Sequence, residues 1–219
     1  MVARDLALLR LSAGNGARMH FQHLSTEGSM ELLRAAKRDG LPVTSEATPH
    51  HFTLSDERVQ TYDPVFKVNP PLRAPSDVAA VKAALGDGTL DAIATDHAPH
   101  PRESKEQPFD QAPPGMLGLE TALALALTEL DLPVERLLAL MSWQPARIAG
   151  MDPTQGRAIA EGSPANLCVF SPDETWLVDA TALASRSTNT PYDGMKLRGK
   201  VRHTVYNGEA VVRESQAQR

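Results

Sequence analysis

Residues 90–100 read LDAIATDHAPH, a short apolar run that ends in a cluster of polar side chains. Two earlier stretches follow the same plan, MHFQHLST at residues 19–26 and VTSEATPHH at residues 43–51. The apolar part of each stretch has the length and character of a strand. Between them, helical spacing predicts helices over residues 30–38 and 76–85, the second with Ser76 as its N-cap. Strands that alternate with helices predict an α/β fold with a parallel sheet or barrel.

Side chains alternate across a strand, and this rule predicts which residues share a face. If Asp96 faces the interior of a barrel, Ala94 faces it too, and small residues beneath a carboxylate leave room for a metal or a substrate. The same rule places Phe21 and His23 on one face.

The character of the sequence changes after residue 155. Before it, apolar helices are predicted at about 119–130, 134–140 and 145–149. Beyond it, short β runs at 165–170, 175–178 and 201–212 are separated by turns, and the last contains Asn207-Gly208, a strong hairpin signal. We therefore expect two parts, an α/β part over residues 1–155 and a small β element over residues 156–219.

Composition narrows the class of protein. The 219 residues carry 22 basic and 27 acidic side chains, a net charge of −5, and 42% are hydrophobic, as in ordinary globular proteins. An acidic balance without a basic cluster argues against nucleic-acid binding. The sequence has no apolar run long enough for a membrane span, no secretory signal, and a single cysteine, Cys168. These features predict a cytoplasmic protein.

The three polar clusters hold six of the seven histidines and follow three predicted strands. In parallel α/β folds, reactive groups gather where the strands end. Imidazole and carboxylate groups are zinc ligands, and a carboxylate can also accept a proton from water. The pattern indicates a zinc hydrolase, although any one histidine taken alone is more simply a structural or loop residue.

Four segments, in their order and spacing, resemble the signatures of bacterial class I dihydroorotases, which belong to the zinc-dependent amidohydrolase superfamily. They are HFQHLST, VTSEATPHH, KVNPPLR and AIATDHAPH. The resemblance covers nearly the whole chain. It implies the last three strand–helix units of a (β/α)₈ TIM-type barrel in residues 1–155, followed by part of a small β-sandwich in residues 156–219.

The resemblance also implies roles for individual residues. His23 matches a zinc-binding histidine after the sixth barrel strand, and Asp96 matches a zinc-binding aspartate after the eighth. The aspartate also serves the family as general base and acid, passing a proton to the leaving nitrogen. Asn69 and His100 match substrate-binding residues, and Pro114-Gly115 matches a loop whose backbone contacts the substrate. One or two zinc ions are implied as cofactor.

Simpler interpretations stay open for these residues. Asp96 could be an N-cap or ion-pair carboxylate, and Asn69 a turn residue before two prolines. Support or packing, not metal binding, is expected of His50 and His51.

The remaining candidates are interpreted without a site role. The expectations are a structural role for His20 and His203, a bracing role in its loop for His97, a core position for Cys168, and a solvated surface for residues 102–106.

The family's remaining signatures are absent from these 219 residues: the HxHxR segment, a bridging carboxylate and a further histidine. A full barrel takes roughly 250 residues. A catalytic zinc site has three protein ligands, and here only His23 and Asp96 match. We therefore expect Met1 to lie in mid-domain and this chain alone to be inactive.

Three functions remain open. The first is the C-terminal part of a dihydroorotase, which interconverts L-dihydroorotate and N-carbamoyl-L-aspartate in de novo pyrimidine synthesis. The second is a non-catalytic subunit that scaffolds aspartate transcarbamoylase. The third is a related cyclic amidohydrolase acting on allantoin or a hydantoin. A small-molecule substrate is expected in the first and third cases, and a homo-oligomer or a transcarbamoylase assembly is possible.

Overall fold

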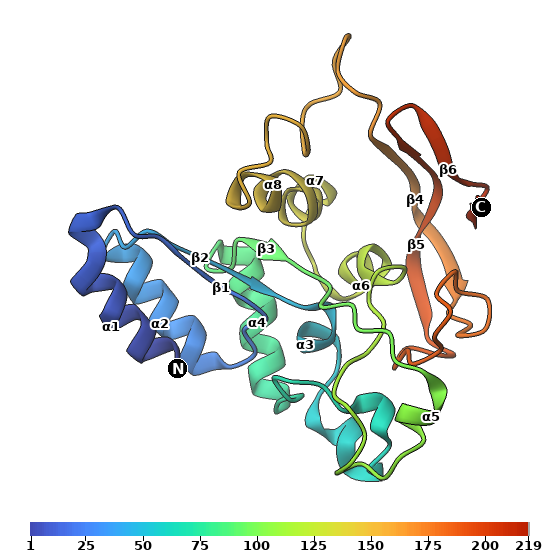
Figure 1. Ribbon diagram of the computed structural model, residues 1–219, viewed down its shortest axis with the longest axis horizontal. Helices are drawn as coiled ribbons and strands as arrows, with labels where there is room; N and C mark the ends of the chain where they lie inside the picture. Colours follow the sequence, from blue (N-terminus) through green and yellow to red (C-terminus); the bar gives the residue numbers. More distant parts are fainter. Residues whose placement is uncertain (219) are drawn as a thin grey trace.

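The computed structural model describes residues 1–218, apart from the side chain of Ala13, and shows helices packed around one parallel and one antiparallel sheet (Figure 1). The helices are α1 (Val2–Ser12), α2 (Glu27–Arg38), α3 (Pro49–Thr53), α4 (Pro75–Asp87), α5 (Arg102–Lys105), α6 (Ala122–Glu129), α7 (Val134–Leu138) and α8 (Gln144–Ile148). The strands are β1 (Met19–Phe21), β2 (Val43–Ala47), β3 (Ala92–Ile93), β4 (Leu167–Leu177), β5 (Lys196–Tyr206), β6 (Glu209–Arg213) and β7 (Gln216–Ala217). Short 3₁₀ turns cover Ala13–Asn15, Asp56–Thr61 and Pro64–Phe66, and a π-helical segment, Ala139–Trp143, joins α7 to α8.

Strands β1, β2 and β3 form the parallel sheet, with β2 in the middle. Met19 pairs with Val43, and Ala47 pairs with Ile93. The predicted parallel α/β arrangement is confirmed. β3 is shorter than the expected 90–95, because β2 ends at Ala47 and Pro49, which opens α3, has no N–H to extend the ladder.

Capping and proline at the first turn determine where the two longest helices, α2 and α4, begin. α2 starts at Glu27, three residues before the predicted start, since the Thr26 side chain caps it by accepting from the Ser29 N–H. The Ser76 cap predicted for α4 is wrong. The helix starts at Pro75 with Ala74 as N-cap, because proline at the first helical position has its φ already set and loses no hydrogen bond.

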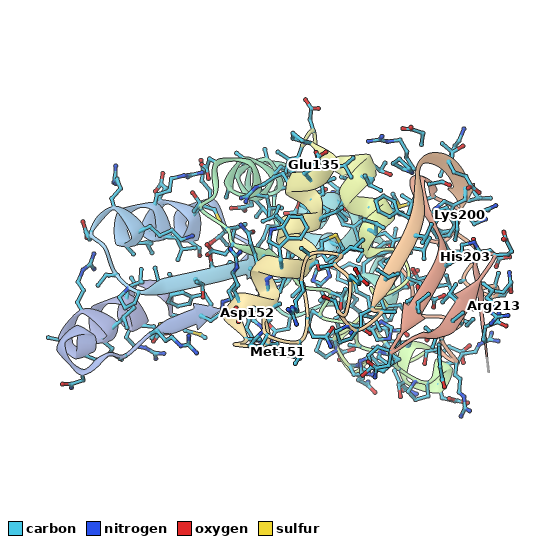
Figure 2. The ribbon with its side chains drawn as sticks, turned by 90° about the horizontal axis from the view of Figure 1, so that it is seen from above. Glu135, Met151, Asp152, Lys200, His203 and Arg213 are labelled. Atoms are coloured by element: carbon cyan, nitrogen blue, oxygen red, sulfur yellow. The ribbon has the colours of Figure 1, made fainter. Side chains whose placement is uncertain are left out.

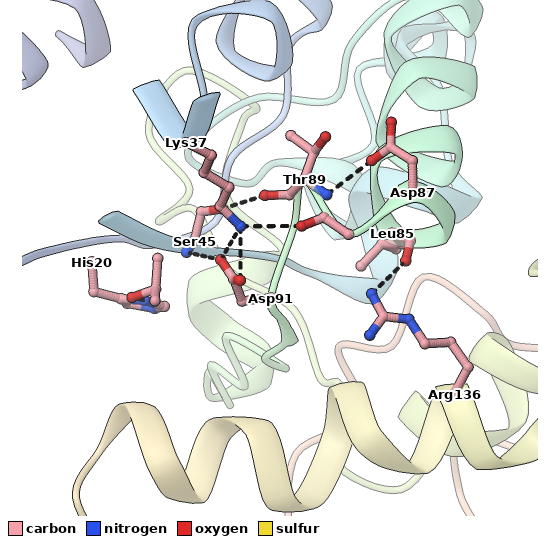
Figure 3. Close-up of polar contacts among 10 residues, drawn as sticks. His20, Lys37, Ser45, Leu85, Asp87, Thr89, Asp91 and Arg136 are labelled. Carbon is pink, nitrogen blue, oxygen red and sulfur yellow. Dashed lines mark hydrogen bonds and ion pairs between the residues drawn. The ribbon is translucent and has the colours of Figure 1, made fainter. Parts of the chain in front are cut away.

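A polar network lies where the chain enters β3 (Figure 3). Lys37 of α2 places its Nζ 2.7 and 2.8 Å from the two carboxylate oxygens of Asp91, just before β3. The same carboxylate accepts from the Ser45 backbone N–H of β2 at 2.9 Å. One carboxylate therefore ties α2, β2 and the entry to β3 together.

The C-terminal strands form an antiparallel sheet in the order β4-β5-β6-β7. The predicted hairpin at Asn207-Gly208 is confirmed, since it joins β5 to β6. The two β runs expected at 165–170 and 175–178 are one long strand, β4, whose register shifts twice against β5. Cys168 is exposed, so the prediction of a core cysteine is wrong: β4 turns apolar positions outward as well, including Val169 and Leu177.

One hydrophobic core runs through both sheets. Leu125 and Leu127 of α6 belong to the same buried cluster as Val178, Tyr192 and Leu197 from the antiparallel part. In Figure 1, α6 lies between the parallel sheet and β5. The antiparallel sheet is thus packed directly onto the helical layer that carries the parallel strands.

Close approach of β5 to α6 requires Gly199. Its φ is +94°, and a Cβ there would lie 3.4 Å from the Leu127 Cβ and clash with the end of that side chain. We expect Gly199→Ala to lower the free energy of unfolding by about 1–2 kcal/mol, through backbone strain and overpacking. Urea titration measures this. The matched control is Gly28→Ala in α2, where a Cβ meets nothing within 4 Å and a small stabilisation is expected.

Among residues 1–218, none of the helices is both long enough and apolar enough to span a lipid bilayer.

Candidate active site

The two predicted metal ligands lie just beyond the ends of parallel strands, in an unusual backbone conformation. His23 follows β1 with φ +40°, and Asp96 follows β3 with φ +47°. Residues other than glycine rarely adopt positive φ, and the cost is of order 1–3 kcal/mol each. Such strain persists where surrounding contacts impose it, and it clusters at functional sites. Six non-glycine residues of the described chain have positive φ, and His23 and Asp96 are the two of them that follow parallel strands.

This geometry corrects the alternation rule used on the sequence. β1 ends at Phe21 and β3 at Ile93, so the strict period of two stops before His23 and Asp96. The left-handed backbone redirects both side chains at the strand ends. Sharing a face with Phe21 or Ala94 therefore cannot be inferred from residue parity.

The donor set fits part of a zinc site. His23 offers an imidazole nitrogen and Asp96 carboxylate oxygens, both ordinary zinc donors. Asp96 is exposed and His23 is half-buried. Within the described part of the chain, no group of three or more His, Cys, Asp or Glu residues could hold a metal ion. His23 and Asp96 can each donate to a metal ion, but a complete metal site needs further ligands.

The short helix α3, which follows β2, carries two buried histidines. His50 is 1% exposed and His51 is 2% exposed. Burial lowers the pKa of both: that of His51 falls to about 4, and that of His50 lies well below its ordinary 6.5, with His51 and His23 nearby as lesser causes. Both imidazoles are therefore neutral at pH 7. The Nε2 of His50 has no hydrogen-bond partner among the described residues.

His51 supports the turn that carries Asn69. Its Nε2 lies 3.0 Å from the carbonyl oxygen of Pro70, and its Nδ1 lies 2.8 Å from the Thr48 hydroxyl. A carbonyl can only accept, so Nε2 carries the proton and Nδ1 accepts from the hydroxyl. Asn69 itself is exposed at the same end of the sheet. The expected supporting role of the histidine pair agrees with this geometry for His51.

His100 and the Pro114-Gly115 loop are brought together. The His100 Nε2 lies 3.0 Å from the Pro114 carbonyl oxygen, and the Gly115 N–H donates to the Lys67 carbonyl at 2.8 Å. Gly115 has φ +135°, and a Cβ there would lie 2.7 Å from both the His100 Nε2 and the Ala98 Cβ. Only glycine fits, because the loop backbone passes directly against the His100 ring.

His97 braces this loop, as the sequence suggested. Its Nδ1 accepts hydrogen bonds from the backbone N–H groups of Gly118 at 3.1 Å and Leu119 at 3.3 Å. The Ala98 N–H also donates to the Met116 carbonyl at 3.0 Å. The segment after β3 and the segment 115–119 therefore form one connected unit.

Two lysines that the sequence did not single out hold the same loop. Lys105 donates to the carbonyls of Pro113 at 3.1 Å and Gly115 at 2.9 Å, and Lys67 donates to the Phe109 carbonyl at 2.7 Å. Burial, with the neighbouring Lys67 charge, lowers the pKa of Lys105 to about 8. Arg102 is exposed, as the solvated surface expected for 102–106 requires. Lys105 is half-buried and bonded to two carbonyls, so the expectation does not hold for it. The carbonyls that accept from these lysines lie 8 to 43 residues away in the sequence, and no local sequence pattern predicts such contacts.

The remaining histidines lie in structural contacts. His20 sits on β1 with Nδ1 2.8 Å from the Thr44 hydroxyl and Nε2 3.0 Å from a Glu46 carboxylate oxygen. His203, labelled in Figure 2, lies on β5 of the antiparallel sheet, and its Nε2 is 3.4 Å from a Glu214 carboxylate oxygen. Both match the structural roles expected of them.

Comparison with known proteins identifies the scaffold. A family model described as "Amidohydrolase family" matches residues 7–211. Two similar curated proteins are dihydroorotases, from Mycobacterium leprae (46% identical over 222 residues) and Streptomyces coelicolor (47% over 216 residues). Each alignment covers 97% of this chain and 50% of the relative, so the chain spans about half the length of the curated relatives it matches.

A solved structure agrees with this assignment. The L-hydantoinase (dihydropyrimidinase) from Arthrobacter aurescens superposes with a TM-score of 0.89 at 30% identity, covering the whole of this chain and 49% of that one. The fold matches throughout the chain, and the family model covers nearly all of it. This chain belongs to the amidohydrolase family.

Proposed function

We propose that this chain forms the part of a dihydroorotase that contributes His23 and Asp96 to the metal site. Asn69, His100 and Pro114-Gly115 would contact the substrate. The reaction is the reversible hydrolysis of the cyclic amide of L-dihydroorotate to N-carbamoyl-L-aspartate. The observation that carries the proposal is the shared left-handed backbone of His23 and Asp96 at the ends of parallel strands. Relatives named dihydroorotase at 43–47% identity support the substrate.

Zinc would be held by the His23 imidazole and the Asp96 carboxylate, and it would supply Lewis-acid polarisation of the amide carbonyl. The protein's own step belongs to Asp96. Its carboxylate takes a proton from the attacking water, the carbonyl carbon gains the water oxygen, and the ring C–N bond breaks. The proton then passes to the leaving nitrogen. His100 and the Gly115 backbone hold the substrate in place for this transfer.

We further propose that β1, β2 and β3 are the sixth, seventh and eighth strands of a (β/α)₈ barrel, and that the antiparallel strands are part of a small β-sandwich. Within residues 1–218, β1 and β3 pair only with β2, so each has an open edge. Five further strands, with the HxHxR segment and the remaining ligands, would close the barrel from outside these 219 residues. The division near residue 155 is part of this proposal.

The two alternatives receive less support. A scaffold for aspartate transcarbamoylase does not need strained backbone at the two metal-ligand positions, which costs stability without serving an interface. Hydantoin chemistry is named for a structural neighbour at 30% identity, below the identity of the dihydroorotases.

Reassembly tests the proposed function. The chain would be co-expressed with the half of the Mycobacterium leprae relative that it does not cover, in the presence of zinc. The 219-residue chain alone should show no turnover, because it holds two of the required ligands, whereas the assembly should form N-carbamoyl-L-aspartate from L-dihydroorotate. Chromatography of the products measures both reactions. Turnover by the chain alone, or turnover of a hydantoin but not of dihydroorotate, would contradict the proposal.

A further inference from the structure

Asn189 lies between β4 and β5, far along the chain from the candidate site. Its side chain nevertheless contacts two loops, residues 98–100 and residues 113–117, which are called the substrate loops below because the proposed function assigns substrate contacts to them. Its Nδ2 donates to the carbonyl of Ala98 at 2.9 Å and to the carbonyl of Gly115 at 3.3 Å. Its Oδ1 accepts from the His100 backbone N–H at 3.2 Å. The amide orientation follows from these partners, because two carbonyls require a donor and one N–H requires an acceptor.

The backbone of Asn189 adds a fourth contact, since its carbonyl accepts from the Leu117 N–H at 3.1 Å. The side chain is 6% exposed, so these hydrogen bonds are shielded from water. One buried residue therefore joins the loop that presents His100 to the loop that presents Gly115. A small cavity of about 190 Å³ borders His100 and Asn189.

The segment that carries Asn189 is itself firmly anchored. Tyr192 is 1% exposed and belongs to the main core. Upstream, the N–H groups of Ala184 and Ser185 donate to the Glu120 carboxylate at 2.8 and 3.1 Å. Figure 1 shows this stretch, which leads into β5, lying beside α5 and the loop after β3. Asn189 thus transmits the position of the C-terminal part to the substrate loops.

We propose that Asn189 is a positioning residue that sets the relative placement of His100 and Gly115. This proposal rests on the proposed function for its catalytic consequence, but not for the loop contacts themselves. Loss of the Asn189 amide would leave the Ala98 and Gly115 carbonyls and the His100 N–H without their shared partner. The bonds between Ala98 and Met116 and between His97 and Gly118 would remain, so the loops would loosen around His100 and Gly115 without loss of the core.

Amide hydrogen exchange, followed by NMR on the full 219-residue chain, tests the contact directly. Asn189→Ala should speed exchange at the His100 amide by roughly tenfold or more, as loss of one buried hydrogen bond predicts. Asn166→Ala is the matched control, because the Asn166 side-chain oxygen accepts from the Asn207 N–H in the distant hairpin. It should leave the His100 amide unchanged. Equal exchange at His100 in Asn189→Ala and in the unmodified chain would overturn the proposal.

The reassembled enzyme tests the catalytic consequence. Asn189→Asp has the same shape but replaces the NH₂ donor by a carboxylate oxygen beside two carbonyls. We expect it to raise KM for dihydroorotate at least roughly tenfold, with a smaller change in kcat, because the groups that place the substrate move while Asp96 stays in place. If Asn189 served packing alone, Asn189→Asp would keep the parental KM. That result would overturn the proposal. If the parental assembly shows no turnover, the proposed function fails, and the exchange experiment still decides the role of Asn189.

Discussion

In the reassembled enzyme, Asp96→Asn is expected to lower kcat for dihydroorotate by about 10³-fold or more. The asparagine amide keeps the size of the side chain but cannot accept and return a proton, and general acid–base groups are each worth about 10²–10⁴-fold. In the proposed site the carboxylate is also a metal donor, so the zinc content of the purified assembly should fall in the same variant. Product formation and metal analysis on one sample measure both effects.

A matched control separates the site from surface charge. Asp152, labelled in Figure 2, is an exposed aspartate that follows α8 and not a strand, and Asp152→Asn removes the same charge. It should retain parental kcat and zinc. Parental turnover in Asp96→Asn would show that another group moves the proton, and would remove Asp96 from the mechanism.

The strand ends were predictable because each apolar run stops at polar residues or at a proline. Apolar runs that stop at Gln22-His23, Thr48-Pro49 and Thr95-Asp96 locate the carboxyl ends of three parallel strands, and the structure has them at one sheet edge. The hairpin at Asn207-Gly208 was predictable for the same local reason. The assigned roles of the site residues stay predictions.

The contacts that hold the loops were not predictable, because they join residues far apart in sequence. Asn189 bonds Ala98 and Gly115 across 91 and 74 residues. A polar residue in a proline-containing segment reads as an ordinary turn, and only the folded chain shows its partners. The left-handed backbone of His23 and Asp96 was equally hidden, since nothing local demands positive φ at either residue.

Acid should destabilise the chain through His51. Its folded-state pKa is about 4, against an ordinary value of 6.5. Between pH 6.5 and pH 4 the unfolded chain therefore binds a proton at this residue that the folded chain does not bind. Stability rises with pH wherever the unfolded state holds more protons, so the free energy of unfolding falls as pH falls through this window.

The expected size of this effect is about 2.5 kcal/mol between pH 7.5 and 4.5, because a shift of one pKa unit corresponds to about 1.4 kcal/mol. Urea titrations of the parent and of His51→Gln at several pH values measure it. The variant should be less stable at pH 7.5, since the bonds to Thr48 and Pro70 are lost, and the gap should narrow by about 2.5 kcal/mol at pH 4.5.

The control Asn166→Ala removes no titratable group and should run parallel to the parent across the whole range. A parallel course for His51→Gln as well would mean that the His51 imidazole takes up its proton in the folded chain. The buried, neutral His51 that supports the Asn69 turn would then be excluded. Convergence of the parent and His51→Gln at low pH would instead connect the loss of stability in acid to the same hydrogen bond that holds the Asn69 turn in place.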